Sequence, residues 1–598
     1  MVAETARAGV GAGKLEIWLP VILLAVVGGS LPLWGDSFFG IIATRVCVYW
    51  VLVAGLNLVV GYAGQIAIGW VSLLTIGAYA ASALAGGRVT PEIDPFLSLA
   101  IAGFFGAVFG VIAGLPALRL RTFYFAMTTL GLSTIVTQIA LAWKSVTGGG
   151  VGIPGPAMPG VLADPWGFYY FCLALALICT WMTCNISASR FGRSLVAIRD
   201  AEVAAESVGI YKPRLLVTVF VFSGALAGLA GGLFASLQSY ITPDAFTFDL
   251  SVLFFIAILI GGRGSILGPL IGTIVLTILP EFAAPLVQWS TFLYAVLLLL
   301  IVLLVPGGIA EMLDFKNRKP LDQHREIRPR PELLAQVLVK GGTPRASEST
   351  LDLADLVLSF GGVRAVDGVD LKIRTGEVHG LIGPNGSGKT TTLNIISGYY
   401  APQAGTVHHD GTDITRRGPH TRAASHIART FQTPKLIGES SVLENVMIGG
   451  TIDGRSTFVE TMLALPRHGR DEKHLRESAL TALSLVGLER LADVRADRLQ
   501  HSELRFVEIA RALMMRPRFL LLDEPAAGLS VDEIKRLGAL IVAISRHGTG
   551  VLLVEHHADL IFDICDRVTV LNLGKVLASG TPDEVRTHRE VVNAYLGA

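Results

Sequence analysis

The stretch EVHGLIGPNGSGKTTTLNIISG, Glu377 to Gly398, decides the fold of the second half of this chain. Its first residues, EVHGLI, are typical of a buried strand, GPNGSGKT is a glycine-rich loop, and TTLNIISG is typical of a helix. Backbone N–H groups of a glycine-rich turn at a helix N-terminus bind phosphate oxygens. The order of strand, loop and helix therefore predicts a soluble α/β domain with a P-loop that binds a nucleotide.

The P-loop gives individual residues candidate roles. Lys389 is expected to reach the β and γ phosphates, and the hydroxyl of Thr390 is expected to bind Mg²⁺. The residues expected to bind ATP through the loop are Gly383, Pro384, Asn385, Gly386, Ser387, Gly388, Lys389, Thr390 and Thr391. Alone, this motif also fits kinases and GTPases, so the class of nucleotide-binding protein depends on the motifs that follow it.

Two further strand ends carry groups suited to hydrolysis. FLLLDEP, Phe519 to Pro525, contains Asp523, which suits an outer-shell magnesium role, and Glu524, which suits polarising the attacking water. VLLVEHHADLI contains His556, which can donate to a γ-phosphate near neutral pH, and the adjacent His557 is the weaker candidate. Together with the P-loop, these residues predict an ATP hydrolase.

Residues 1–305 have a different character. The mean hydropathy of +0.57 and the 16% share of charged residues are typical of a membrane protein, and the net charge of +1 disfavours nucleic acid as a partner. Apolar stretches of about 20 residues can cross a bilayer as helices, and this region predicts a polytopic α-helical membrane domain with about 8–10 membrane segments. The stretches lie near 17–34, 41–60, 64–85, 96–117, 122–143, 166–185, 214–238 and 287–305.

Three further features of this region concern how the chain crosses the membrane. LSVLFFIAILI, before Gly261 to Gly264, is too short for an upright span, so a re-entrant pair with the following SILGPLIGTIVLTIL is expected. The glycines of GYAGQIAIG, Gly61 to Gly69, either break a helix beside a passing solute or allow close helix packing. Arg45 either lies in a solute path or extends to the membrane surface, and the second interpretation is preferred.

Loop charges and the linker set the expected topology. The 186–213 loop is basic and the 239–250 loop is acidic, which places the former in the cytoplasm together with both termini. The first apolar segment is expected to be a retained helix rather than a signal peptide. The five cysteines lack metal-ligand spacing and are expected to be reduced packing residues. The expected domains are a transmembrane domain 1–305, a cytoplasmic, solvated linker 306–350 near membrane lipid, and a nucleotide-binding domain 351–598.

Residues 351–598 resemble the ATPases of ATP-binding-cassette (ABC) transporters throughout their length. Phe360, in LSFGG, matches the aromatic residue that stacks on adenine, and Gln432, in ARTFQTP, matches the glutamine that contacts Mg²⁺ and the interface with the membrane domain. The resemblance implies an ABC fold with a helical subdomain. It also implies a magnesium site at Thr390, Gln432 and Asp523, and catalytic roles for Glu524, His556 and Gln432.

The first half resembles the permease subunit, LivM-like, of bacterial branched-chain amino acid importers. The resemblance is carried by GLNLVVGYAGQIAIG, LRLRTFYFAMTTLGLS, TGGGVGIPG and FSGALAGLAGGLFASLQSYITPDAFTF. RTFQ and LLLDEPAAGLS resemble the LivG-like ATPase of the same importers, so the chain resembles a fusion of two subunits. The implied partners are a second permease, a second ABC ATPase and an extracytoplasmic solute-binding protein. GRSLVAIRDAEVAAESVGI, Gly192 to Ile210, resembles the coupling helix that docks on an ATPase near Gln432.

One ABC motif departs from the family pattern. LQHSE, Leu499 to Glu503, stands before EIARAL where an LSGGQ-type signature turn is expected. Gln500 replaces serine or proline, Ser502 follows His501 in place of a glycine, and Glu503 replaces glutamine. A carboxylate near a triphosphate weakens binding by like-charge repulsion unless it points away or pairs with Arg505. The ATP site completed by this turn is expected to be weak, which favours a different partner cassette over a homodimer; a drifted turn that still functions stays open.

These features predict ATP-driven import of branched-chain or other hydrophobic amino acids across the cytoplasmic membrane. Import of urea, short amides or aromatic acids stays open, as does a regulatory subunit with a weakly active ATPase. A membrane-tethered P-loop kinase or GTPase is disfavoured by Gln432, EIARAL and His556. The sequence does not decide between a homodimer and a heteromeric assembly.

Overall fold

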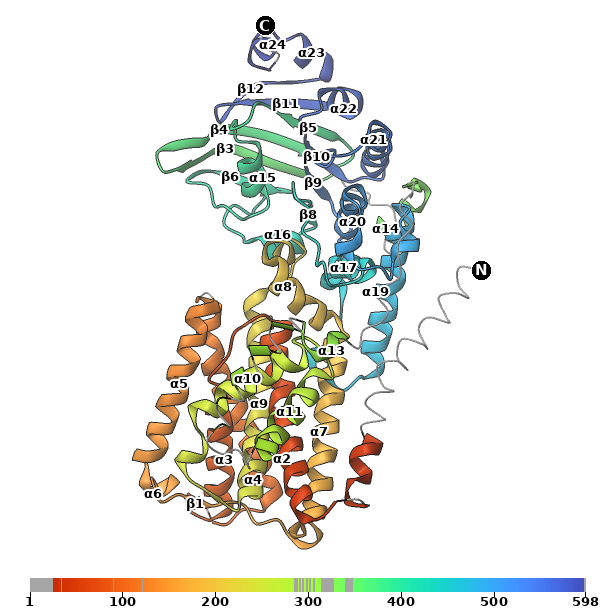
Figure 1. Ribbon diagram of the computed structural model, residues 1–598. Coiled ribbons are helices and arrows are strands. Elements are labelled where there is room, and N and C mark those ends of the chain that lie inside the picture. Colours follow the sequence, from red (N-terminus) through yellow and green to blue (C-terminus); the bar gives the residue numbers. More distant parts are fainter. Residues whose placement is uncertain are drawn as a thin grey trace. The chain divides into compact units, whose positions relative to one another are not determined.

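The chain folds into two units, each described here by itself. The computed structural model (Figure 1) describes residues 25–595 apart from 34, 90, 121, most of 284–306, 313–326 and 339–347. The first unit comprises Met1–Leu195 with Lys212–Lys316, and the second comprises Val196–Tyr211 with Asn317–Ala598. The expected membrane segments near 17–34 and 287–305, and the chain termini, lie largely or wholly outside the described residues.

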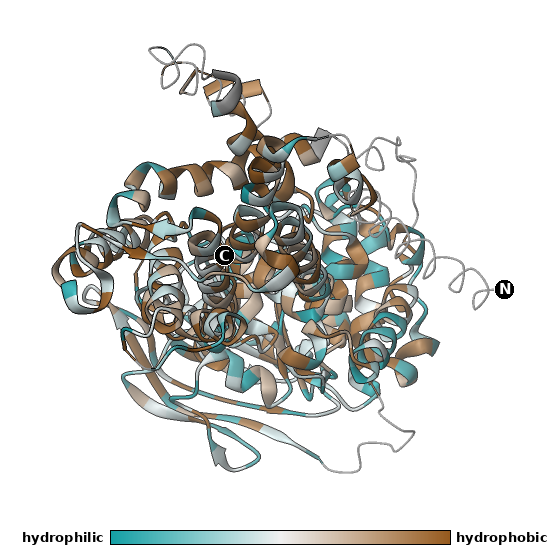
Figure 2. Cartoon of the chain, turned by 90° about the horizontal axis from the view of Figure 1, so that it is seen from below, coloured by the Kyte–Doolittle hydropathy of each residue, from teal (hydrophilic) through white to brown (hydrophobic). Residues whose placement is uncertain are grey.

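Long apolar helices build the first unit. Hydrophobic residues predominate along many of the helices in Figure 2. The helices are α2 (Ser37–Asn57), α3 (Val71–Ala85), α4 (Pro95–Gly114), α5 (Thr122–Ala142), α6 (Lys144–Thr147), α7 (Pro165–Ser187), α9 (Lys212–Gln238), α10 (Phe248–Gly261), α11 (Gly268–Ala283) and α13 (Ile309–Met312). Among the described residues, six stretches are long and apolar enough to cross a membrane. The short strands β1 (Ile153–Pro154) and β2 (Tyr240–Ile241) pair with each other.

Small residues bring the helices of this unit close together. A Cβ atom added to Gly106 of α4 would lie 2.2 Å from the carbonyl oxygen of Gly224 on α9, and one added to Gly228 would lie 2.3 Å from that of Ala102. In a bilayer such glycines allow backbones to approach and gain van der Waals contact. The five cysteines are free and buried, as packing residues are.

The segment Gly61 to Gly69 breaks a helix and also packs closely. Helix α2 continues into a π-helical turn, η2 (Leu58–Tyr62), and regular helix resumes only at Val71. A Cβ atom at Gly61 would lie 2.4 Å from the backbone nitrogen of Gly264, and one at Gly69 would lie 1.8 Å from the carbonyl oxygen of Thr129. The helix break and the close packing therefore occur together, because the interrupted backbone needs small residues where other segments meet it, and a solute beside the break stays a prediction.

The expected re-entrant pair consists of α10 and α11, joined by the turn around Gly262 to Ser265. The sequence interpretation underestimated the first member, because the turn η5 (Pro243–Ala245) extends the apolar segment to Pro243–Gly261, 19 residues long. That length qualifies it as a candidate span, whereas Gly268–Pro280 belongs with the shorter apolar helices.

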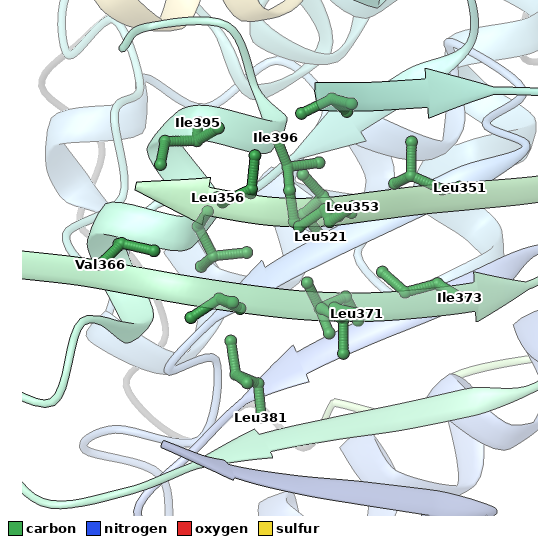
Figure 3. Packing of buried hydrophobic residues seen from close by; sticks show 14 of the residues in the cluster. Leu351, Leu353, Leu356, Val366, Leu371, Ile373, Leu381, Ile395, Ile396 and Leu521 are labelled. Carbon is green, nitrogen blue, oxygen red and sulfur yellow. The ribbon is translucent and has the colours of Figure 1, made fainter. Parts of the chain in front are cut away.

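The second unit contains two sheets. The six-stranded sheet has the order β12-β11-β5-β10-β9-β8, with only the β11–β12 pair antiparallel, and the four-stranded antiparallel sheet has the order β4-β3-β6-β7. Buried aliphatic side chains from β3, β4, β5, β9 and the helix α15 form one core between them (Figure 3). The strands are β3 (Thr350–Phe360), β4 (Val363–Arg374), β5 (Val378–Ile382), β6 (Ala404–His409), β7 (Thr412–Asp413), β8 (Ile427–Arg429), β9 (Phe519–Asp523), β10 (Gly550–Val554), β11 (Arg567–Asn572) and β12 (Lys575–Gly580).

Helices flank these sheets and form the helical part of the unit. Several start with a serine or threonine whose hydroxyl accepts the N–H three residues on, such as Ser441 before α17 and Ser530 before α21. The helices are α15 (Lys389–Ile396), α16 (Pro419–Ala424), α17 (Val442–Gly449), α18 (Phe458–Met462), α19 (Pro466–Leu485), α20 (His501–Leu513), α21 (Val531–Arg546), α22 (Ala558–Ile564), α23 (Pro582–Thr587) and α24 (Arg589–Tyr595).

The end of the expected linker is packed onto the second unit. Residues 327–338 include α14 (Leu334–Leu338), whose Leu334, Val337 and Leu338 are buried. The Arg330 guanidinium pairs with Glu489 at 2.9 Å, and Arg536 of α21 donates to the carbonyl oxygen of Ile327 at 2.8 Å. The expectation of a solvated linker is wrong for this stretch, because ELLAQVLV offers apolar residues at helical spacing.

Candidate functional site

The P-loop lies between β5 and α15, and its backbone requires glycine. Gly383, Gly386 and Gly388 have φ values of +152°, +82° and +103°. A Cβ atom at Gly383 would lie 2.1 Å from the carbonyl oxygen of Leu571, and one at Gly388 would lie 2.4 Å from that of Ala365. The loop is therefore a cradle of backbone N–H groups that only glycine can form at these positions.

The side chains of the P-loop suit a phosphate group. The buried Ser387 hydroxyl has no hydrogen-bond partner among the described residues, and Thr390 is exposed at the start of α15. The ammonium group of Lys389 donates to the carbonyl oxygens of Gly383 and Pro384, at 2.8 and 3.0 Å. Burial lowers the pKa of Lys389, and the carboxylates of Glu524 and Asp523 oppose that effect. A triphosphate would supply both the missing acceptor for Ser387 and a stronger partner for Lys389.

Asp523, the candidate magnesium residue, lies at the end of β9 and is 2% exposed. Its Oδ2 atom accepts a hydrogen bond from Arg429 at 2.9 Å, while its Oδ1 atom is buried without a partner among the described residues. Burial raises the pKa of Asp523, and the Arg429 guanidinium lowers it. A buried carboxylate oxygen without a donor fits the hard cation that the sequence predicted there.

Glu524 is held by two side chains from neighbouring strands. The amide of Gln432, after β8, donates to its Oε2 atom at 2.8 Å, and Nε2 of His556, after β10, lies 2.7 Å from its Oε1 atom. Strands β8, β9 and β10 are adjacent and parallel, so their carboxyl ends meet at one edge of the sheet. Three residues far apart in the sequence thus form one hydrogen-bonded group, in which Glu524 adopts a φ of +48°.

Two aromatic residues of the second unit, Phe360 and Tyr400, lie next to each other. Phe360, at the end of β3, is 46% exposed, and its ring centroid lies 5.2 Å from that of Tyr400. An exposed ring on a rigid strand suits stacking on a purine. Tyr400 was not singled out in the sequence, because it belongs to the irregular turn after α15, where no motif points to it.

The signature turn places Glu503 away from solvent. Glu503 is 2% exposed, and its Oε2 atom accepts the backbone N–H of Gln500, the N-cap residue of α20, at 2.8 Å. Arg505 donates instead to the backbone carbonyl oxygens of Phe431 and Gln432. The Glu503 carboxylate thus avoids repulsion of a triphosphate by pointing away from it and capping its own helix, rather than by pairing with Arg505.

The other signature residues contact their own chain. Nε2 of His501 lies 3.1 Å from the carbonyl oxygen of Ala527, and the hydroxyl of Ser502 lies beside the carboxylate of Glu533 on α21. The N-terminus of the 13-residue helix α20 remains a favourable place for an anion. The departure from LSGGQ therefore leaves the helix terminus intact and changes its side-chain surroundings.

We expect Ser502→Gly to raise ATP turnover of the assembled transporter by a few-fold, which corresponds to less than about 1.4 kcal/mol of barrier. Glycine removes the hydroxyl that lies beside Glu533 and lets a phosphate approach the N-terminus of α20 more closely. Glu503→Gln is expected to give no gain, because it replaces a capping carboxylate and costs about 0.5–1 kcal/mol of helix stability. Steady-state phosphate release and thermal unfolding of both variants check this; a gain with Glu503→Gln alone would restore the charge-repulsion interpretation.

The chain is similar to known proteins in both halves. The family profile described as "Branched-chain amino acid transport system / permease component" matches residues 38–306, and that described as "ABC transporter" matches residues 366–527. A third profile, "Branched-chain amino acid ATP-binding cassette transporter", matches residues 575–598. Over 252 residues the chain is 39% identical to the high-affinity branched-chain amino acid transport ATP-binding protein BraF of Pseudomonas aeruginosa. This alignment covers 42% of this chain and 99% of BraF. The chain belongs to the branched-chain amino acid ABC transporter family.

A second relative agrees with this assignment, and one solved structure is similar to the cassette. The LivG ATP-binding protein of Escherichia coli is 36% identical over 252 residues, covering 42% of this chain and 99% of that protein. A solved nucleotide-free ATP-binding cassette from an ABC transporter is 31% identical, with a TM-score of 0.37, and covers 42% of this chain and 100% of that chain. The protein is a multi-pass membrane transporter subunit in which a permease is fused to a nucleotide-binding ABC ATPase, and ATP hydrolysis is coupled to transport.

Most of the candidate coupling segment of this transporter, from Val196 onward, belongs to the second unit. Helix α8 (Arg190–Ser207) contains a break at Ala201, where φ is −148° and ψ is 63°. From Val196 to Tyr211 the segment packs with the cassette. Arg199 pairs with Glu439 at 2.8 Å, and the ring centroids of Tyr211 and His420 lie 4.5 Å apart. The sequence pattern located the segment but not its partners, since Glu439 and His420 lie outside every ABC motif.

Proposed function

We propose that the chain is one permease and one ATPase of an importer that brings hydrophobic amino acids of the branched-chain type across the cytoplasmic membrane. The observation that carries this proposal is that the permease profile over residues 38–306 and the cassette relatives share one chain, and both are described in terms of branched-chain amino acids. Urea, short amides and aromatic acids are the alternative solutes.

The geometry at the edge of the β8–β10 strands supports ATP hydrolysis at this chain's own P-loop. Glu524 is oriented by Gln432 and His556, so its carboxylate is fixed where it can accept a proton from an attacking water. Lys389 and the P-loop N–H groups would bind the phosphates, and Phe360 would stack on the adenine. Thr390, Gln432 and Asp523 would hold Mg²⁺, which neutralises the charge that develops on the phosphates.

The proposed assembly pairs this cassette with a second one. Each ATP would contact one cassette through the P-loop and the other through the N-terminus of α20. Binding shifts such an equilibrium only by its different affinity for the open and closed arrangements. The altered surroundings of Ser502 favour a partner cassette with a glycine signature turn, although the inward-facing Glu503 removes the charge argument against a homodimer. A second permease and an extracytoplasmic binding protein complete the proposed importer.

The proposed orientation places the cassette in the cytoplasm. The basic 186–213 loop contains Val196–Tyr211, which packs within the cassette unit, and this supports a cytoplasmic position for that loop. The solute path is proposed to run beside the break between α2 and α3, because interrupted helices expose backbone groups within a membrane. Gln65 lies within this break and is 9% exposed, and its side-chain amide donates to the carbonyl oxygen of Ala63 at 3.3 Å.

We expect Asn57→Ala to reduce solute uptake by about tenfold. Asn57 is buried at the end of α2, where its Nδ2 atom donates to the carbonyl oxygen of Ser265 at 2.8 Å and its Oδ1 atom accepts the N–H of Gly264 at 3.0 Å. Each interhelical hydrogen bond in a membrane contributes about 0.6–2 kcal/mol to helix association. Losing both bonds therefore weakens the contact between the end of α2 and the turn that joins α10 to α11. Thr180→Val is the matched control, because its hydroxyl bonds within its own helix, to Ala176. Uptake equal to that of the control would exclude a role for this contact in transport.

Uptake in cells lacking and expressing the chain tests the proposed function directly. Radiolabelled leucine, isoleucine, urea, acetamide and benzoate are supplied separately, with the neighbouring transporter genes intact. Leucine and isoleucine uptake that depends on both the chain and ATP is expected. Uptake of another solute instead would reassign the substrate, and uptake unaffected by Glu524→Gln would favour the alternative of a regulatory subunit.

A further inference from the structure

Arg429, the last residue of β8 and the first of the RTFQ stretch, is a buried cation to which the resemblance assigned no role of its own. Its side chain is 4% exposed and its Nη2 atom donates to Oδ2 of Asp523, which is 3% exposed, at 2.9 Å. Its Nη1 atom donates to Oδ1 of Asn394 at 2.6 Å and lies 3.3 Å from the hydroxyl of Ser397, both from the α15 segment. One guanidinium thus links β8, β9 and the helix that follows the P-loop.

This contact fixes one oxygen of the candidate magnesium carboxylate. Since Arg429 occupies Oδ2, the Oδ1 atom is the one left without a partner among the described residues. Removing one member of a buried ion pair leaves an uncompensated charge, which then reorients or takes up a proton. The position of Asp523 therefore depends on Arg429 as much as on its own strand.

A line of aromatic contacts runs from Arg429 toward Val196–Tyr211. The guanidinium carbon of Arg429 lies 5.2 Å from the ring centroid of Phe431, which is 9% exposed. The Phe431 ring lies 6.5 Å from that of Tyr399 in an edge contact. The Tyr399 hydroxyl donates to the backbone carbonyl oxygen of Val203. Burial raises the pKa of Tyr399, so this hydroxyl stays a donor at neutral pH.

We propose that Arg429 is a positioning residue that sets Asp523 for the magnesium-bound nucleotide and is coupled, through Phe431 and Tyr399, to the segment Val196–Tyr211. The inference rests on the proposed function, in which Asp523 holds Mg²⁺ at this chain's own ATP site. Coupling between two sites is reciprocal. Weakening the Tyr399–Val203 bond must therefore alter nucleotide binding at Asp523, although Tyr399 lies outside the nucleotide site.

A double-mutant cycle on the full chain in its assembled transporter tests the proposal. All proteins carry Glu524→Gln, so that binding of ATP is measured without hydrolysis, in the presence of Mg²⁺ and in EDTA. The quantity of interest is the gain in ATP affinity that Mg²⁺ provides. We expect Arg429→Lys to reduce this gain about tenfold and Tyr399→Phe about fivefold, within the usual range of site coupling, while affinity in EDTA changes less than twofold. The double variant is expected to match Arg429→Lys alone.

Arg518→Lys is the matched control, because Arg518 precedes the start of β9, at the opposite end of the strand from Asp523, and pairs with Asp410 at 2.8 Å. The proposal is overturned if Arg429→Lys lowers thermal stability but leaves the gain in ATP affinity from Mg²⁺ unchanged. An unchanged gain in Tyr399→Phe, or additive effects in the double variant, also overturns it. Tyr399→Phe keeps its ring, so the test holds even where Arg429→Lys fails to fold. If the parent protein itself shows no magnesium-dependent gain, the proposed ATP site fails, which separates that outcome from failure of the Arg429 coupling alone.

Discussion

Glu524→Gln is expected to lower ATP hydrolysis at this chain's P-loop by at least about 100-fold while ATP binding is retained. Glutamine has the same shape, so its side-chain oxygen can still accept one bond from Gln432 or His556. It cannot accept a proton from water, which is the step proposed for the carboxylate of Glu524, held in place by Gln432 and His556. The substitution thus keeps the hydrogen-bonded arrangement around position 524 and removes the proposed general base.

The measurement is single-turnover hydrolysis in the assembled transporter, with the partner cassette inactivated so that only this site contributes. Glu444→Gln is the control, because Glu444 caps α17 by accepting the N–H of Ser441 and lies outside the candidate site. Hydrolysis by Glu524→Gln equal to that of the control would contradict the catalytic assignment and favour the regulatory alternative.

The second large effect is expected for Lys389→Ala, which should weaken ATP binding between about 10- and 100-fold. A charged hydrogen bond contributes about 1.5–3 kcal/mol, and each 1.4 kcal/mol is a factor of ten in affinity. Alanine also removes the cation that opposes the carboxylates of Asp523 and Glu524, so the remaining site repels a triphosphate. The repulsion adds to the loss of the hydrogen bond, so we expect a loss in the upper part of this range.

Titration with a fluorescent ATP analogue, with thermal unfolding measured in parallel, checks this expectation. Lys372→Ala is the control, because Lys372 pairs with Asp352 at 3.1 Å on the four-stranded sheet. Affinity within twofold of that control in Lys389→Ala would mean that the P-loop backbone alone binds the phosphates and that the side chain has another role.

The signature turn shows where sequence reasoning reached its limit. The substitutions at Ser502 and Glu503 were visible as letters, and the expected repulsion followed from charge alone. Only the backbone of α20 showed that the Glu503 carboxylate turns back to the N–H of Gln500. A side chain's direction depends on the element that carries it. Because Glu503 lies in the first turn of α20 and caps it, the repulsion expected between its carboxylate and a triphosphate no longer follows.

The linker shows a similar limit. Its charge and its prolines predicted a solvated tether, yet Leu334, Val337 and Leu338 are buried on the second unit. Composition averaged over 306–350 conceals a short apolar helix, because burial is decided by the few residues that share one face.

The sequence by itself determined the P-loop, the acidic residues after the buried strand, the membrane character of the first half and the fusion of the two. Those features depend on local order and on composition, which are properties of the chain. The tertiary structure alone decided that Gln432 and His556 hold Glu524, that Arg429 holds Asp523, and that Tyr399 reaches Val203. The order of strands in the folded sheet brings the first two groups within hydrogen-bond distance, and the packing of α8 in the second unit brings Val203 to Tyr399.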